Sequence, residues 1–196
     1  MRSVYDFVVT PKGNRYNNSK KIGGKDLILN AEIQNHLYIN REAIVVSTPI
    51  IGETDIKPGD TVIVHHNVFR RWHNIKGVEK NSKSFFNEDT YFITDEQIFL
   101  YKRDAEWKCP KGYCFVKPLK AIDIFNVDEE KPLIGIVKHT DGTVEKEDLV
   151  GFKPGSKFEF LIDSERLYRV LSHFITIKYE YQGNEEEYNP SWTHSG

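Results

Sequence analysis

Three large aliphatic residues follow a long polar segment near the start of the chain. Residues 12–26 are mostly Gly, Asn, Lys and Ser, and Leu27, Ile28 and Leu29 come directly after them. A segment this polar buries too little apolar surface to order by itself. The pattern predicts a mobile loop whose aliphatic side chains bind a hydrophobic groove. The alternative is a buried strand, which is the usual place of a short apolar run.

The energies of such a loop favour an assembly with several copies. Each buried Leu or Ile contributes about 1.5–3 kcal/mol, so three of them supply roughly 5–9 kcal/mol. Ordering about ten loop residues costs on the order of 10 kcal/mol. One loop should therefore bind weakly, whereas several loops on one ring bind well through their effective concentration. The loop thus predicts self-association into a ring.

A second group of chemically active residues runs from His65 to His73 and mixes basic with aromatic side chains. Arg and Trp are frequent anchors of protein interfaces, so Phe69, Arg70, Arg71 and Trp72 are predicted to contact another subunit or domain. The same mixture suits single-stranded nucleic acid, whose bases stack on aromatic rings. We do not favour nucleic acid as the partner, because the charge elsewhere in the chain offers no supporting field.

Catalytic and metal-binding patterns are missing from the sequence. His65 and His66 would point to opposite faces of a strand, so they are not expected to share a metal. Cys109 and Cys114 lack the second ligand pair that a zinc site needs, and we expect two reduced thiols. The chain has no P-loop, nucleophile elbow, His-Glu-x-x-His or G-x-G-x-x-G motif. We therefore predict no catalytic residues, no metal, no cofactor and no enzymatic activity.

The composition favours a β protein. The chain has 196 residues, 39% of them hydrophobic and 13% aromatic, and Val, Ile, Phe, Tyr and Thr dominate the apolar stretches. Its net charge of -2 gives no general attraction to nucleic acid or an anionic membrane. No stretch has the roughly 20 apolar residues of a membrane-spanning helix, and the first residues do not resemble a signal peptide. A cytoplasmic location is therefore expected.

An internal repeat predicts the architecture that positions these residues. Four short patterns recur in the same order, which indicates a duplicated β unit. Residues 5–11 are repeated at 113–118, 43–45 at 135–137, the Lys-Pro-Gly turn at 57–59 with its following strand at 153–160, and residues 91–98 at 168–175. The first copy is longer before Ile44 and again before Tyr91. The predicted domains are residues 1–103, residues 104–181 and a flexible acidic tail at 182–196.

The ordered patterns of the first copy resemble the GroES (chaperonin-10) co-chaperonin family, of bacteriophage type. Residues 56–62 match its V-x-x-G-D-x-V strand, and residues 91–98 match its closing strand. Gly23 and Gly24, followed by the aliphatic residues 27–29, match its glycine-plus-tripeptide loop. The resemblance implies two tandem GroES-like β-barrels in an all-β chain. The second copy lacks the glycine pair and the tripeptide, so the loop's role is not carried over there.

The resemblance also implies a function and its partners. The partner would be an ATP-bound GroEL-type chaperonin, capped through Gly23, Gly24, Leu27, Ile28 and Leu29 while an unfolded substrate protein folds inside. Nucleotide would bind the chaperonin, and a phage-encoded chain would act in the host cytoplasm. Two alternatives stay open at this point. One is a phage structural or assembly protein that uses the barrel as a ring scaffold, and the other is a β-barrel that binds single-stranded nucleic acid.

Overall fold

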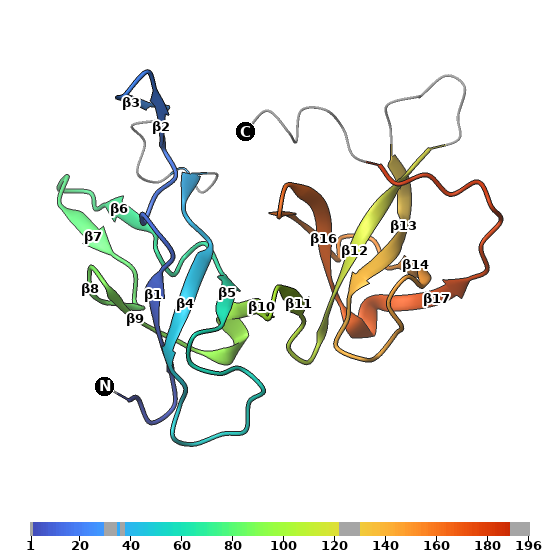
Figure 1. The fold of residues 1–196 in the computed structure, drawn as a ribbon, viewed down its shortest axis with the longest axis horizontal. Helices are drawn as coiled ribbons and strands as arrows, with labels where there is room; N and C mark the ends of the chain where they lie inside the picture. Colours follow the sequence, from blue (N-terminus) through green and yellow to red (C-terminus); the bar gives the residue numbers. More distant parts are fainter. Residues whose placement is uncertain (1, 30–34, 36–37, 122–129, 189–196) are drawn as a thin grey trace. The chain divides into compact units, whose positions relative to one another are not determined.

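The chain folds as two units that are both built from antiparallel strands (Figure 1). The computed structural model describes residues 2–29, 35, 38–121 and 130–188. Unit 1 is Met1–Trp107 and unit 2 is Lys108–Gly196. Strands make up 51% of the chain and helices 4%, so the predicted all-β class is confirmed. Among the described residues, no helix is long and apolar enough to cross a membrane.

Unit 1 contains a seven-stranded sheet in which β1 (Phe7–Pro11) lies between β4 and β9. Its strand order is β11-β10-β5-β4-β1-β9-β8. The other members are β4 (Glu42–Ser47), β5 (Thr61–Val64), β8 (Phe85–Asn87), β9 (Thr90–Ile93), β10 (Ile98–Arg103) and β11 (Glu106–Lys108). Two further hairpins, β2–β3 and β6–β7, form separate two-stranded sheets.

Unit 2 contains a six-stranded sheet with the order β15-β16-β12-β13-β14-β17. Its strands are β12 (Tyr113–Lys120), β13 (Glu130–His139), β14 (Leu149–Phe152), β15 (Lys157–Ile162), β16 (Glu165–Leu171) and β17 (Ile175–Tyr179). Read from its other edge, this order is β17-β14-β13-β12-β16-β15. It corresponds strand by strand to β10-β5-β4-β1-β9-β8 of unit 1. A 3-10 turn precedes the equivalent strands β10 and β17, η2 (Asp95–Gln97) before β10 and η3 (Ser172–Phe174) before β17.

Strand pairing fixes which residues of the two units are equivalent. Val9 pairs with Val45 and Tyr91, and Val116 pairs with Val137 and Tyr168. In both units the register shifts immediately before this valine, between Val8 and Val9 and between Phe115 and Val116. The inward-facing side chains of these strands form the two cores, in keeping with the alternation of a strand between two faces. The units are therefore equivalent in order, register and core.

The structure corrects two of the alignments expected from the sequence. Pro11 pairs with Ala43 and Pro118 with Gly135, so the prolines are equivalent and Phe7 corresponds to Cys114 rather than Phe115. The second error concerns the Lys-Pro-Gly turns. The turn at 57–59 precedes β5, whereas the turn at 153–155 follows β14, the strand equivalent to β5. The residues Lys-Pro-Gly suit any tight turn. Their presence in both units therefore did not mean that the two turns connect equivalent strands.

The true counterpart of the Lys57-Pro58-Gly59-Asp60 turn is Glu145-Lys146-Glu147-Asp148. Asp60 accepts a hydrogen bond from the Lys57 N–H at 2.8 Å, and Asp148 accepts one from the Glu145 N–H at 3.0 Å. The residue before each aspartate has a positive φ, 93° for Gly59 and 68° for Glu147. The same turn therefore forms with glycine in one unit and with a strained glutamate in the other.

Neither large sheet closes on itself within the described residues. The edge strands β11 and β8 of unit 1 are not paired with each other, nor are β15 and β17 of unit 2. In the segment predicted as a flexible tail, residues 186–188 lie beside β12. The Lys120 N–H donates to the Glu186 carbonyl and the Tyr188 N–H to the Pro118 carbonyl, each at 2.8 Å. Residues 189–196 of that segment lie outside the described residues.

Candidate binding hairpin

The predicted loop forms a two-stranded hairpin that projects from unit 1 (Figure 1). β2 (Ser19–Ile22) pairs with β3 (Lys25–Ile28), and within the described residues each strand pairs only with the other. The turn consists of Gly23 and Gly24 with φ of 58° and 80°. Two consecutive positive φ values are typical of a type I′ hairpin turn, which glycine adopts without steric cost. The glycine pair therefore fixes a hairpin where the sequence had suggested an unstructured tether.

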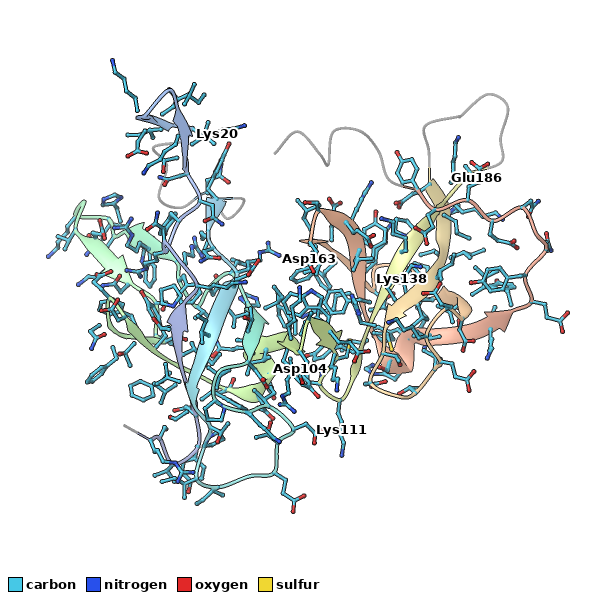
Figure 2. All side chains as sticks on the ribbon, viewed as in Figure 1. Lys20, Asp104, Lys111, Lys138, Asp163 and Glu186 are labelled. Atoms are coloured by element: carbon cyan, nitrogen blue, oxygen red, sulfur yellow. The ribbon has the colours of Figure 1, made fainter. Side chains whose placement is uncertain are left out.

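The aliphatic residues of the hairpin are exposed. The exposed fractions of Leu27, Ile28 and Leu29 are 52%, 68% and 48%, and Ile22 is 57% exposed. A buried strand, the alternative considered for this run, is not what the structure contains. All eight strand residues of the hairpin are exposed, and Figure 2 shows Lys20 on the hairpin, apart from the main sheet of unit 1.

Strand register divides the apolar residues between the two faces of the hairpin. Lys20 is opposite Leu27 and Ile22 is opposite Lys25, so Ile22 and Leu27 are diagonal neighbours on one face. Leu29 continues this face, with its N–H bonded to the Asn18 carbonyl at 2.7 Å. Ile28 lies on the other face opposite Ser19. The hairpin therefore offers a stripe of three aliphatic residues on one side and one isoleucine on the other.

The base of the hairpin is held firmly by Arg15. Its Nε donates to the Phe69 carbonyl at 2.9 Å, and its Nη2 donates to Asn81 Oδ1 at 2.7 Å. Its guanidinium lies 5.1 Å from the centre of the Phe85 ring and 5.5 Å from that of Tyr91. Burial raises the pKa of Tyr91 to about 12, so this tyrosine stays neutral beneath the arginine.

Tyr16 provides a second anchor between the base and the β6–β7 hairpin. β6 (Arg71–His73) pairs with β7 (Glu79–Asn81). The Arg71 N–H donates to the Tyr16 hydroxyl at 2.8 Å, and the Arg71 guanidinium lies 4.8 Å from the centre of the Tyr16 ring. Burial alone would lower the pKa of Arg71, but its bonds to Tyr16 and Glu79 outweigh burial and raise it. The two hairpins of unit 1 thus meet at their bases.

The predicted contact residues 69–72 have different surroundings. Phe69 is fully buried in the core of unit 1, where its ring meets that of Tyr91 edge-on at 4.7 Å. Arg71 is paired with Glu79 at 3.1 Å and supports the hairpins. Arg70 and Trp72 are half-buried and line a cavity. The structure therefore leaves Arg70 and Trp72 as the members of this group that can meet a ligand or partner.

The histidine geometry assumed from the sequence is wrong, although no metal cluster results. β5 ends at Val64, so His65 and His66 lie in the following turn, where their rings stack at 4.3 Å. Among the described residues, no group of three or more His, Cys, Asp or Glu side chains could hold a metal ion. Burial raises the pKa of Cys109 and Cys114, as expected for structural thiols.

Sequence reasoning missed the residues that hold the hairpin in place. Arg15, Tyr16 and Asn81 belong to segments that carry no motif, and their contacts join residues 54 to 66 positions apart. The Gly-Gly pair flanked by Ile22 and Lys25 was the one local signal of a hairpin.

Comparison of the sequence with known families and curated proteins identified no relative of the chain. No protein-family model matches the chain, and no curated protein matches it significantly.

Proposed function

We propose that the chain is a co-chaperonin that caps an ATP-bound GroEL-type chaperonin through the β2–β3 hairpin. In this proposal the two units are GroES-like β units of a phage-type protein, and several copies form a ring in the host cytoplasm. An unfolded substrate protein would be enclosed by the chaperonin and would not need to touch the hairpin.

The observation that carries the proposal is the exposure of Leu27, Ile28 and Leu29 on a hairpin outside the main sheet. Leu27 and Leu29 form an apolar stripe with Ile22 on one face of the hairpin, and this stripe gains free energy when a hydrophobic groove covers it. The hairpin form also lowers the cost of binding, because the type I′ turn already orders part of the segment. The weak contact of one hairpin is repeated around a ring, which supports docking that is both stable and reversible.

The proposal is tested by native mass spectrometry of the full chain with host chaperonin and ATP. Leu27→Asp should reduce binding at least tenfold per hairpin, because Leu27 lies in the apolar stripe and an aspartate cannot enter an apolar groove without a partner. The matched control is Ile75→Asp, since Ile75 is fully exposed at the tip of the β6–β7 hairpin. Circular dichroism should show that both variants stay folded.

The outcomes separate this proposal from its alternatives. Equal loss of binding in the two variants, or none in either, would contradict the role of the β2–β3 hairpin. A ring that forms but never binds chaperonin would favour a structural or assembly protein of a phage particle.

A further inference from the structure

A cavity of about 400 Å³ lies in unit 1 beside the β6–β7 hairpin. This volume falls within the range of small-molecule binding sites. Trp72 and Arg70 form half-buried walls, Ser84 is buried, and Lys83 is exposed at the edge. Asn67, Ser82 and Gln97 complete the lining. The cavity is thus a site with one aromatic wall, two cationic side chains and several hydrogen-bonding groups.

Both cationic side chains of the cavity are available to an anion. Among the described residues that line it, none carries a carboxylate. The Nε of Arg70 is buried, and no described residue accepts a hydrogen bond from it. Arg70 lines the cavity, so its guanidinium can bind a ligand anion through charge-assisted hydrogen bonds. The arginine is therefore placed to bind an anionic ligand.

The hairpin next to the cavity adds a local positive field. Residues 70–83 include five Lys or Arg and a single acidic residue, Glu79, in a chain whose net charge is -2. Glu79 is already paired with Arg71 at 3.1 Å. Positive charge beside a concave site attracts anions and speeds their association.

The remaining lining groups suit a flat, polar ring. Trp72 offers an aromatic surface on which a base can stack. Gln97 Oε1 accepts a hydrogen bond from the Thr94 N–H at 3.1 Å, which directs its NH₂ group to other acceptors. Ser82 Oγ donates to the Val68 carbonyl at 2.6 Å and can still accept a hydrogen bond. Both donors and acceptors are therefore present beside the aromatic wall.

We propose that this cavity binds a nucleoside phosphate, either free or as part of a single strand. The base stacks on Trp72, and the phosphate binds Arg70 and Lys83. This site is separate from the β2–β3 hairpin, so it stands or fails independently of chaperonin binding. Phe69 takes no part in stacking, because it is buried in the core.

Isothermal titration calorimetry of the full chain alone tests this proposal with AMP, inorganic phosphate and a ten-residue oligothymidylate. AMP should bind at one site, and Lys83→Gln should weaken it about tenfold, the effect of losing one charged hydrogen bond. The control Lys76→Gln removes the same charge from the hairpin tip, outside the cavity lining, and should change AMP affinity less than twofold. Trp72→Leu should weaken AMP binding but leave inorganic phosphate binding unchanged.

Comparison of the three ligands distinguishes a free nucleotide from a single strand and shows which results would contradict the proposal. Binding of AMP and the oligonucleotide with similar affinity per site identifies a free nucleotide as sufficient. Binding of the oligonucleotide alone, weakened by Lys83→Gln and Trp72→Leu and by added salt, identifies a single strand. The proposal is overturned if neither nucleotide ligand binds, or if phosphate binds as tightly as AMP. Equal losses from Lys83→Gln and Lys76→Gln would also overturn it, since they would indicate general charge attraction.

Discussion

Ile44 on β4 and Ile136 on β13 occupy the same position in the two units, yet their exposed fractions are 36% and 5%. In unit 2, Ile136 packs with Leu119 and Leu149 in a second cluster besides the main core. In unit 1 the residue equivalent to Leu149 is Thr61, which faces Ile44 across the strands. Unit 2 thus buries apolar residues that unit 1 leaves in contact with solvent.

The next outward residue on these strands shows the same contrast. Val46 on β4 is 50% exposed. Its equivalent Lys138 on β13 is paired with Glu147 at 3.0 Å and with Glu187 at 2.8 Å. Unit 1 also carries the exposed β2–β3 hairpin. Its β6–β7 hairpin lies in the connection between β5 and β8, and the equivalent connection in unit 2, between β14 and β15, has only the four residues 153–156. Unit 1 therefore carries two hairpins, β2–β3 and β6–β7, that have no counterpart among the described strands of unit 2.

The turn aspartates provide the strongest test of this comparison. The Asp60 carboxylate is buried and binds Arg103 through two hydrogen bonds, at 3.0 and 2.6 Å. Asp148 binds Lys178, whose side chain is 59% exposed, at 2.8 Å. Asp60→Asn should lower the free energy of unfolding of unit 1 by about 2–3 kcal/mol, because it removes the charge from a buried carboxylate that accepts two hydrogen bonds from Arg103. Asp148→Asn should cost unit 2 about 1 kcal/mol or less, as expected for an exposed pair.

Hydrogen exchange with mass spectrometry in urea measures the two units separately. Equal losses in the two variants would contradict the difference in burial. A loss that spreads equally to both units would show that they do not unfold independently.

The contribution of Asp60 should also depend on pH. Burial alone would raise the pKa of Asp60, but the hydrogen bonds from Arg103 and from the Lys57 N–H lower it below the ordinary 3.8. A carboxyl whose pKa is lowered by folding stabilises the folded state above its unfolded pKa, and this stabilisation is lost as the pH falls through the folded pKa. The difference in unfolding free energy between the unmodified chain and Asp60→Asn should therefore be constant from pH 5 to 7 and shrink below about pH 4. Urea unfolding at pH 3 and pH 6 checks this, and an unchanged difference would contradict the ionised pairing.

A smaller effect is expected at the residue before each aspartate. Gly59 has a φ of 93°, so Gly59→Ala should destabilise unit 1 by about 1 kcal/mol. Glu147 has a φ of 68° at the equivalent position, so Glu147→Gly should relieve backbone strain. Its gain should stay within about 0.5 kcal/mol, because the substitution also removes the ion pair with Lys138. Urea titration gives both values, and a stabilising Gly59→Ala would contradict the strain expected for a side chain at this positive φ.

The sequence predicted the β class but aligned its two copies only in part. Strand composition and the Tyr91 and Tyr168 patterns are local signals, and the ladder places these two tyrosines in equivalent positions. The Lys-Pro-Gly turns misled the alignment because the same three residues suit any tight reversal. The true equivalence of residues 57–60 and 145–148 rests on hydrogen bonds to the neighbouring strand, formed by the Val45 and Val137 backbones. A glutamate in place of glycine hid that relationship from the residue pattern.

The candidate site was predictable in its residues but not in its form. The exposed aliphatic run follows from composition, whereas the anchoring of its base by Arg15 depends on contacts with Phe69 and Asn81 that only the folded chain brings together. The cavity at Trp72 was likewise invisible, since its lining extends from the turn after β5 to η2.

The smallest effect on stability is expected at the residues proposed to matter most for binding. Replacing Leu27, Ile28 and Leu29 together by Ser should change the free energy of unfolding of unit 1 by less than about 0.5 kcal/mol, because all three side chains are about half exposed or more. A matched triple replacement of Leu119, Ile136 and Leu149 should instead destabilise unit 2 by several kcal/mol, since each is at least 95% buried. Urea unfolding of the two variants measures both effects. A large loss on replacing the hairpin residues would mean that they pack against the protein itself, and their exposure could then no longer be attributed to binding a partner.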